Sequence, residues 1–434
     1  MRYTPAEKEL FVQNRKNFRA LMKNSSMAIF HANDEMPRSA DGFFAFRQNP
    51  DLYYLSGIDQ EKTILLMYPD SPNPAYQEVL FLRKTNEHIA IWEGHKYSIE
   101  EARNASGIKT IFWLEEFDNI FPMLMNGCSN VYLNANEHDR FSSEVPSKDL
   151  RFANALRSQY PLHNYDRSAP LMSSLRSIKS DAEIRMMQNA MDITGKAFQR
   201  VLGFIKPGVM EYEIEAEITH EFIRNRAGGH AYTPIIASGK NACVLHYTDN
   251  SQECLSGDVV LMDFGAEYAN YAADLTRSVP VNGRFTDRQK KVYQSVLNVL
   301  KAARKMLVAG NTFDVYNKEV GYVMEKELIG LGLLNNKDVE AQHPDRPLYK
   351  KYFMHGTSHF LGLDVHDVGN RYEKMQAGMV FTCEPGIYIP EENLGIRLEN
   401  DILITEKGPI DMMGHIPIEV DEIEDLMHKN LVHA

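Results

Sequence analysis

Residues 259–277 read Val259-Val260-Leu261-Met262-Asp263-Phe264-Gly265-Ala266-Glu267-Tyr268-Ala269-Asn270-Tyr271-Ala272-Ala273-Asp274-Leu275-Thr276-Arg277. A strongly apolar run ends in Asp263, and a second run contains Asp274. The pattern predicts a β-hairpin with a loop centred between Tyr268 and Ala269, so that the two aspartates are direct cross-strand partners. Residues that face each other in this way have Cβ atoms roughly 4.5–5.5 Å apart. Two carboxylates that close repel each other unless a cation or a proton lies between them.

A second segment repeats this arrangement around Glu384 and Glu399. Their midpoint lies between Glu391 and Glu392, in the loop-like segment 390–395, and apolar residues flank the loop on both sides. Two hairpins that each present a facing pair of carboxylates indicate a buried acidic site, and metal ions are the usual partners of buried acids. The alternative is that these acids are ordinary surface charges on strands, and a β-bulge could shift either register.

Three histidines, His355, His359 and His366, lie close together between the two predicted hairpins. His246 stands apart, and a lone histidine is more often a core or surface residue than a functional one. No cysteine clusters with these residues, which excludes a thiolate site. Four carboxylates with one imidazole form a hard, oxygen-rich donor set, which suits pairs of manganese, iron, cobalt or zinc ions better than a closed structural zinc site.

Composition narrows the class of protein. A chain of 434 residues predicts two domains. The formal net charge of −12 argues against a nucleic-acid-binding surface. Neither a membrane span nor a signal peptide is expected, because there is no long apolar stretch and no apolar segment at the N-terminus. The cysteines lack metal-site spacing and predict reduced thiols, so we expect a cytoplasmic protein; they are Cys128, Cys243, Cys254 and Cys383.

Alternating helix and strand patterns fill the first 170 residues and favour a sheet covered by helices. Residues 160–174 contain two prolines and three serines without apolar periodicity. We place the domain boundary there, which gives domains 1–174 and 175–434. Ser180 and Glu183 form a capping-box pattern that opens a helix. The expected helices are 6–23, 181–202, 211–225, 287–308 and 315–328, and the expected strands before the boundary are 26–30, 52–55, 63–68, 79–82, 109–114 and 130–134.

Residues 177–406 resemble the pita-bread metallopeptidases, which include methionine aminopeptidase, prolidase and aminopeptidase P. Segment 47–57 resembles the aminopeptidase P and prolidase branch, and segment 356–362 is more similar to aminopeptidase P than to prolidase. The hairpin between Glu384 and Glu399 is shorter than in some aminopeptidases P. The motifs that carry the resemblance are Asp263-Phe264-Gly265-Ala266, the segment 271–277, His355-Gly356, Ser358-His359, the segment 364–369, Glu384-Pro385-Gly386 and Gly395-Ile396-Arg397-Leu398-Glu399.

The resemblance implies an α+β fold. A C-terminal pita-bread (creatinase/aminopeptidase) catalytic domain would follow an N-terminal α/β domain like that of creatinase and prolidase, which would serve oligomerisation and access to the cleft. It also implies two divalent metal ions, Mn²⁺ first, with Co²⁺, Zn²⁺ or Fe²⁺ as alternatives. Asp263 would chelate one ion, Asp274 and Glu399 would bridge the two, and His359 and Glu384 would complete the other.

The resemblance further implies an Xaa-Pro aminopeptidase, in which a hydroxide between the ions attacks the carbonyl group of the bond before proline. Such a bond has no N–H and a fixed φ, so peptidases that hold the backbone through that N–H cannot grip it. Glu384 would carry the proton to the leaving nitrogen, and Arg397 would position a ligand carboxylate. His246, His355 and His366 would lie in the cleft and handle the substrate.

Trp92 matches a family tryptophan that reaches the cleft of a neighbouring subunit; the alternative is a packing residue at a strand end. The expected partners are proline-containing peptides and further copies of the chain, as a homodimer or homotetramer, with no nucleic acid and no membrane. Two other functions stay open: a prolidase, restricted to Xaa-Pro dipeptides, and a non-catalytic binding module on the same fold.

Overall fold

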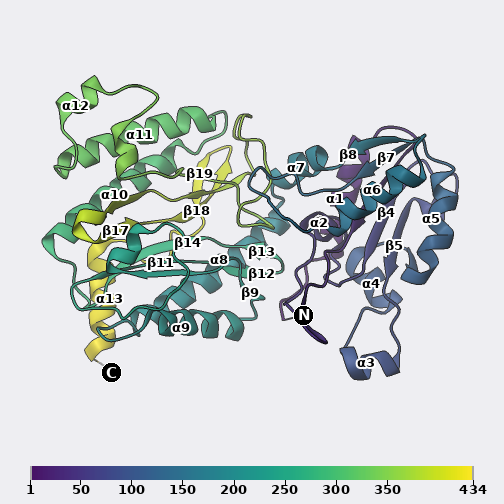
Figure 1. The fold of residues 1–434 in the computed structure, drawn as a ribbon, viewed down its shortest axis with the longest axis horizontal. Helices are drawn as coiled ribbons and strands as arrows, with labels where there is room; N and C mark the ends of the chain where they lie inside the picture. Colours follow the sequence, from purple (N-terminus) through teal and green to yellow (C-terminus); the bar gives the residue numbers. More distant parts are fainter. Residues whose placement is uncertain (1, 433–434) are drawn as a thin grey trace. The chain divides into compact units, whose positions relative to one another are not determined.

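The structure, a computed structural model, describes residues 2–432. It divides into two compact units, one formed mainly by the purple-to-blue part of the chain in Figure 1 and the other mainly by the teal-to-yellow part. The N-terminal unit comprises Pro5–Arg176, and the C-terminal unit comprises residues 2–4 together with the described chain from Ser177 onward. Residues 160–174 contain a strand and most of a helix, β8 (Asn164–Arg167) and α7 (Ala169–Ser177). Within the described part of the chain, no helix is both long and apolar enough to cross a membrane.

The N-terminal unit contains a six-stranded mixed sheet in the order β6-β5-β4-β1-β7-β8. Every residue of the central strands β1 and β4 is buried, because the sheet is covered on both faces. The strands are β1 (Ser26–His31), β4 (Ile64–Met67), β5 (Glu78–Leu82), β6 (Thr110–Trp113) and β7 (Asn130–Leu133); a small hairpin is formed by β2 (Pro37–Ser39) and β3 (Gly42–Phe43). The helices are α1 (Lys8–Leu21), α2 (Pro50–Ser56), α3 (Glu87–Glu93), α4 (Ile99–Ser106), α5 (Phe117–Met125) and α6 (Lys148–Gln159).

The strand expected at residues 52–55 is wrong, because this segment is the buried helix α2. A short apolar run fits a buried strand and a buried helix equally well, and the flanking residues decide between them. The side chain of Asn49 accepts hydrogen bonds from the backbone N–H groups of Asp51 (3.0 Å) and Leu52 (3.2 Å). Pro50 occupies the first helical position, and Gly57 ends the helix with a φ of 68°.

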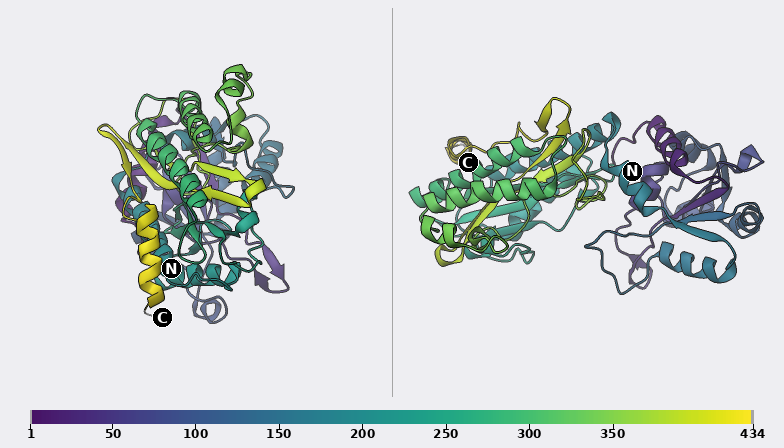
Figure 2. Two further views of the ribbon diagram at one scale, coloured as in Figure 1. Left: turned by 90° about the vertical axis from the view of Figure 1, so that its left-hand side faces the viewer. Right: turned by 90° about the horizontal axis from the view of Figure 1, so that it is seen from above.

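The C-terminal unit builds small antiparallel sheets between helices. Helix α8 packs on β12, and helix α9 packs on β10. Helix α10 packs on β15, β17 and β19, and it lies beside α11 (Figure 2). The helices are α8 (Asp181–Leu202), α9 (Glu211–Arg224), α10 (Asp287–Met306), α11 (Phe313–Gly330), α12 (Asn336–Ala341) and α13 (Val420–Val432). The strands are β9 (Gly229–His230), β10 (Ile235–Ser238), β11 (Val259–Phe264), β12 (Ala266–Tyr268), β13 (Tyr271–Ala272), β14 (Leu275–Pro280), β15 (Val380–Cys383), β16 (Gly386–Ile389), β17 (Leu394–Arg397), β18 (Asn400–Thr405) and β19 (Gly408–Asp411).

The first hairpin differs from its expected register by two residues. Tyr268 pairs with Tyr271, and Asp263 faces Thr276 instead of Asp274. The reason is a two-residue turn at Ala269 and Asn270, where φ is 52° and 65°. Positive φ at both turn positions suits the right-handed twist of a hairpin. Because side chains alternate with a period of two, the shift leaves both aspartates on the same face, as diagonal neighbours.

The expected register of the second hairpin is confirmed. Cys383 pairs with Asn400 before the acids, and Gly386 pairs with Arg397 after them. The same register on both sides places Glu384 opposite Glu399. The loop is closed by the pairing of Ile389 with Leu394. Both acidic pairs thus belong to antiparallel hairpins of the C-terminal unit.

Candidate metal centre

Three side chains form a group that could hold a metal ion: Asp274, His359 and Glu399. One ligand atom from each lies within 4.8 Å of the others. Nδ1 of His359 is 3.0 Å from the carbonyl oxygen of Phe360, to which it donates, so Nε2 is the nitrogen directed at the acids. Burial alone would lower the pKa of His359, but its hydrogen bond with Asp274 and the charge of Glu384 raise it overall. A metal ion bound at Nε2 would take the place of the proton that a charged His359 carries there.

The other two expected ligands lie beside this group. Nε2 of His359 is 3.7 Å from a carboxylate oxygen of Glu384 and 3.5 Å from one of Asp274. The hydroxyl of Tyr232 lies against Oδ1 of both Asp263, at 2.6 Å, and Asp274. All five expected ligands are thus in one site.

Arg397 is the permanent cation of the site and is almost fully buried. Its Nη2 donates to Oδ2 of Asp263 at 2.7 Å, its Nη1 to the hydroxyl of Tyr388 at 2.9 Å, and its Nε to Oγ1 of Thr276 at 3.2 Å. Thr276 in turn donates to Oε2 of Glu399 at 2.6 Å. Arg397 therefore orients Asp263 directly and Glu399 through Thr276, as the partners of metal ligands commonly do.

The carboxylates of the site outnumber the cations around them, and three of them have raised pKa values. Burial and the charges of Asp274 and Glu384 raise the pKa of Glu399 well above its ordinary value. Burial, opposed by His359, raises the pKa of Glu384 to about 7. Burial also raises the pKa of Asp263, despite the nearby Arg397. Buried acids in this number ionise together only with added positive charge, and oxygen-rich sets of this kind are ligands for divalent metal ions. The residues fit a metal site.

A further acid, Asp401, was not expected from the sequence. It is fully buried, and its Oδ2 accepts a hydrogen bond from the backbone N–H of Asp274 at 3.1 Å. Its other oxygen has no hydrogen-bond partner among residues 2–432. Burial and the charge of Asp274 raise the pKa of Asp401 well above its ordinary value. Asp401 thus holds the backbone at Asp274, one of the expected metal ligands.

A chain of hydrogen bonds leads from Arg397 to His355. The hydroxyl of Tyr388 accepts from Arg397 and donates to Nε2 of His355 at 2.8 Å, and Nδ1 of His355 donates to the carbonyl oxygen of Gly356 at 2.7 Å. Burial and the charge of Arg397 lower the pKa of His355 to about 3. His355 is therefore a neutral imidazole beside Glu384, whose Oε2 is 3.7 Å from its Nδ1.

The remaining two histidines border this group. The ring of His366 lies 4.2 Å from the ring of His359, centroid to centroid. His246 is exposed, and it is close enough to His355 for its charge to contribute to lowering the pKa of that residue. The structure therefore places His355 beside Glu384, His366 beside His359, and His246 near His355.

Comparison with known proteins identifies the family. Residues 185–406 match metallopeptidase family M24, and residues 11–132 match the aminopeptidase P N-terminal domain. The chain belongs to metallopeptidase family M24. Its expected α+β fold, with a pita-bread C-terminal domain and an α/β N-terminal domain, is confirmed, and it is a metal-dependent hydrolase.

Full-length relatives support this family assignment. The Xaa-Pro aminopeptidases of Haemophilus influenzae and Escherichia coli strain K12 are 34% and 36% identical to the chain. The first match covers 97% of both chains, and the second covers 96% of this chain and 97% of the relative. A solved structure of Pseudomonas aeruginosa aminopeptidase PepP has a TM-score of 0.90 at 31% identity and covers all of both chains. Zn-substituted Escherichia coli aminopeptidase P, in complex with product, has a TM-score of 0.88 at 33% identity and covers 98% of this chain and 99% of its own.

Trp92 is part of a helix and does not lie at the end of a strand. It is in helix α3 of the N-terminal unit and is 81% exposed. The packing role is therefore wrong, because the side chain is not buried within its own unit.

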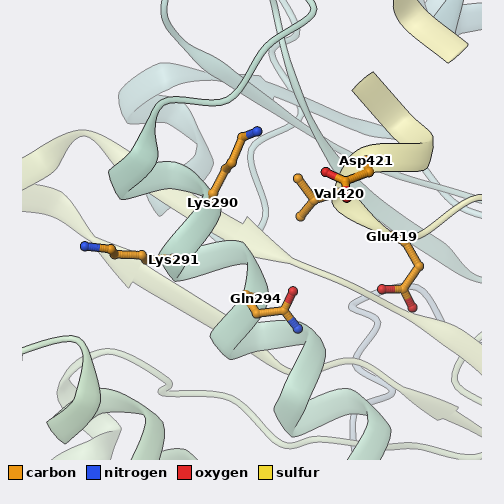
Figure 3. Close-up of a pocket in the computed structure, with 6 residues that line it drawn as sticks. All are labelled: Lys290, Lys291, Gln294, Glu419, Val420 and Asp421. Atoms are coloured by element: carbon orange, nitrogen blue, oxygen red, sulfur yellow. The ribbon is translucent and has the colours of Figure 1, made fainter. Parts of the chain in front are cut away.

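A surface depression is lined by residues of α10 and by residues at and just before the start of α13 (Figure 3). Its lining is mixed in charge, and one of its lysines, Lys290, pairs with Glu424 at 3.0 Å. None of the expected site residues line it; the lining residues are Lys290, Lys291, Gln294, Glu419, Val420 and Asp421.

Proposed function

We propose that this chain is an Xaa-Pro aminopeptidase, which releases the N-terminal residue from peptides with proline in second position. The observation that carries the proposal is the gathering of five metal-type ligands, two of them buried and three partly buried, in a chain of which 96–97% matches Xaa-Pro aminopeptidases. The match of residues 11–132 to the aminopeptidase P N-terminal domain supports it further.

The proposed cofactor is a pair of divalent ions held by Asp263, Asp274, His359, Glu384 and Glu399, with Mn²⁺ first and Co²⁺, Zn²⁺ or Fe²⁺ as alternatives. Four carboxylates and one imidazole support a hard metal. Ions bound there would lower the pKa of a water molecule and polarise the substrate carbonyl group.

The residues of the chain divide the remaining work. Glu384 is the residue proposed to accept a proton from the nucleophile and pass it to the leaving nitrogen. Neutral His355 has one N–H group, at Nδ1, which donates to the carbonyl oxygen of Gly356, while Nε2 accepts from the hydroxyl of Tyr388. His355 can therefore donate a hydrogen bond to a substrate oxygen only after Nδ1 leaves Gly356. His246 and His366 are the residues proposed to hold the peptide. Arg397 holds Asp263 in place and opposes the rise in its pKa that burial causes.

The N-terminal unit is proposed to serve oligomerisation and cleft access. The exposure of Trp92 supports a contact with a second copy of the chain, in a homodimer or homotetramer. All four cysteines are free, which agrees with the proposed cytoplasmic location.

A length series of proline peptides tests the function. The metal-free protein is supplied with Mn²⁺ and given Xaa-Pro dipeptides, Xaa-Pro-Xaa tripeptides and longer peptides. Release of the first residue from tripeptides and longer peptides is expected, with loss on chelation and recovery with Mn²⁺. Cleavage of dipeptides alone would identify a prolidase, and cleavage by a verified metal-free sample would refute a metal-dependent mechanism.

The ligand assignment has its own test. Replacing His359 with alanine should lower the metal-to-protein ratio, because it removes the imidazole from the ligand set. His343→Ala is the matched control, since His343 is exposed and its Nδ1 contacts Asp345, two residues further along the chain, through a carboxylate oxygen at 3.7 Å and the backbone N–H at 3.2 Å. An unchanged ratio in His359→Ala would remove this residue from the proposed ligands.

A further inference from the structure

Glu211, at the start of α9, is a buried carboxylate outside the metal centre. It is 0% exposed and accepts four hydrogen bonds. Oε1 accepts from the backbone N–H of Ser238 at 2.7 Å and from the side-chain amide of Asn241 at 3.2 Å. Oε2 accepts from the hydroxyl of Tyr247 at 2.7 Å and from the backbone N–H of Gln252 at 2.9 Å. All four donors are neutral, and all come from the segment 238–252.

The same segment carries His246. Its two chain neighbours, Leu245 and Tyr247, are partly buried and pack against a core cluster that includes Tyr388, whereas His246 is exposed. Tyr388 is the residue whose hydroxyl joins Arg397 to His355. The direction in which His246 points is therefore set by how Leu245 and Tyr247 are held.

The beginning of the segment is in close contact with the strand that leads to the metal ligands. A Cβ atom added to Gly395, in β17, would lie 2.2 Å from the carbonyl oxygen of Ala242. Ser238 ends β10, which pairs with the strand that carries Asp263. At the far end, the backbone N–H of Glu211 donates to the carbonyl oxygen of Gln252 at 2.9 Å, so Glu211 and Gln252 bond to each other twice.

We propose that Glu211 is a positioning residue, which fastens both ends of segment 238–252 and the hydroxyl of Tyr247 so that His246 faces the metal centre. The inference deepens the proposed function and rests on it, because it assumes that His246 handles the peptide substrate. An anion suits this position, since one carboxylate can accept all four bonds whereas an amide presents a donor where two donors already point.

A double-mutant cycle tests the proposal in the Mn²⁺-loaded enzyme. The kcat/KM for an Xaa-Pro-Xaa tripeptide is compared among the wild type, Glu211→Gln, His246→Ala and the double variant. Glu211→Gln is expected to lower kcat/KM about tenfold in the wild-type background and by less than about twofold when His246 is already absent. Equal losses in both backgrounds would overturn the proposal, because Glu211 would then act independently of His246.

Hydrogen exchange gives a second measurement that does not depend on activity. Glu211→Gln should speed exchange of the amide protons of Ser238 and Gln252, and unchanged rates would overturn the fastening role. Glu213→Gln is the matched control: Glu213 lies on the same helix, is exposed, and accepts from Met210 instead of segment 238–252. It should leave both measurements at wild-type values.

Two further outcomes keep the inference separate from the proposed function. If Glu211→Gln fails to fold, Tyr247→Phe removes one of the four bonds alone and should show the same coupling to His246→Ala, and additive losses would overturn the proposal. If the wild type cleaves no proline peptide, the proposed function fails, while hydrogen exchange still decides whether Glu211 holds the segment.

Discussion

Thr276→Val removes one hydroxyl from the metal centre at almost constant volume. The Thr276 side chain is fully buried; it donates to Oε2 of Glu399 at 2.6 Å and accepts from Nε of Arg397 at 3.2 Å. Both partners are charged, and a hydrogen bond to a charged group contributes about 1.5–3 kcal/mol. Because 1.36 kcal/mol corresponds to a factor of ten, we expect a loss of about 10- to 100-fold in metal affinity or kcat/KM. Losses of about that size are typical when the partner of a metal ligand is removed.

The assay is a titration of metal-free protein with Mn²⁺ in competition with a chelator of known affinity, followed by kcat/KM at saturating metal. Thr276→Ser is the control, because it keeps the Oγ atom and both hydrogen bonds. The serine variant should stay near the wild type while the valine variant loses affinity or activity. A valine variant within about twofold of the wild type in both quantities would refute the inference that Arg397 orients Glu399 through Thr276.

Three other predictions concern stability. The pKa of Glu384 in the folded, metal-free protein is raised to about 7, so the stability that its protonated form contributes is complete below its ordinary pKa and is lost as the pH rises through 7. The melting temperature of the metal-free protein should therefore fall between about pH 5 and pH 8, and Mn²⁺ should raise the melting temperature more at the higher pH. A melting temperature that does not change with pH would contradict the raised pKa of Glu384. Gly265→Ala should destabilise the protein by about 1–3 kcal/mol or more in denaturant unfolding, because the new Cβ would lie 1.7 Å from the carbonyl oxygen of Ala273. Gly330→Ala is the control and should not destabilise the protein, because its new Cβ meets no atom within 4 Å. Ser180→Ala removes the N-cap of α8 and should lower the free energy of unfolding by about 1 kcal/mol without changing kcat. A loss of kcat in this variant would show that the start of α8 also shapes the candidate metal centre.

Sequence periodicity and caps predicted the long elements well. Helix α8 begins and ends where the capping box at Ser180 and the apolar pattern place it. Residues 52–55 were misread as a strand because four buried residues in a row carry no period, and the decisive signal was the capping residue Asn49 followed by Pro50. The register of the first hairpin was wrong by two residues, because no glycine marks the turn at Ala269 and Asn270.

The expected ligands could be predicted from the sequence, whereas the residues that support them could not. Asp263, Asp274, Glu384 and Glu399 lie in pairs along two hairpins, so spacing alone brings them together. Tyr232, Thr276 and Asp401 are single residues whose roles arise from tertiary contacts, and nothing in their local sequence marks them. Glu211 belongs with them, because its partners are 27 to 41 residues away along the chain.

The central claim is that the five ligands hold two divalent ions. Anomalous diffraction from crystals grown with Mn²⁺ tests it most directly. Two strong peaks are expected between the carboxylates, with Asp274 and Glu399 touching both ions, Asp263 touching one, and His359 and Glu384 touching the other. The absence of any peak at this site at saturating Mn²⁺, or a single ion that leaves Asp263 or His359 without contact, would contradict the account.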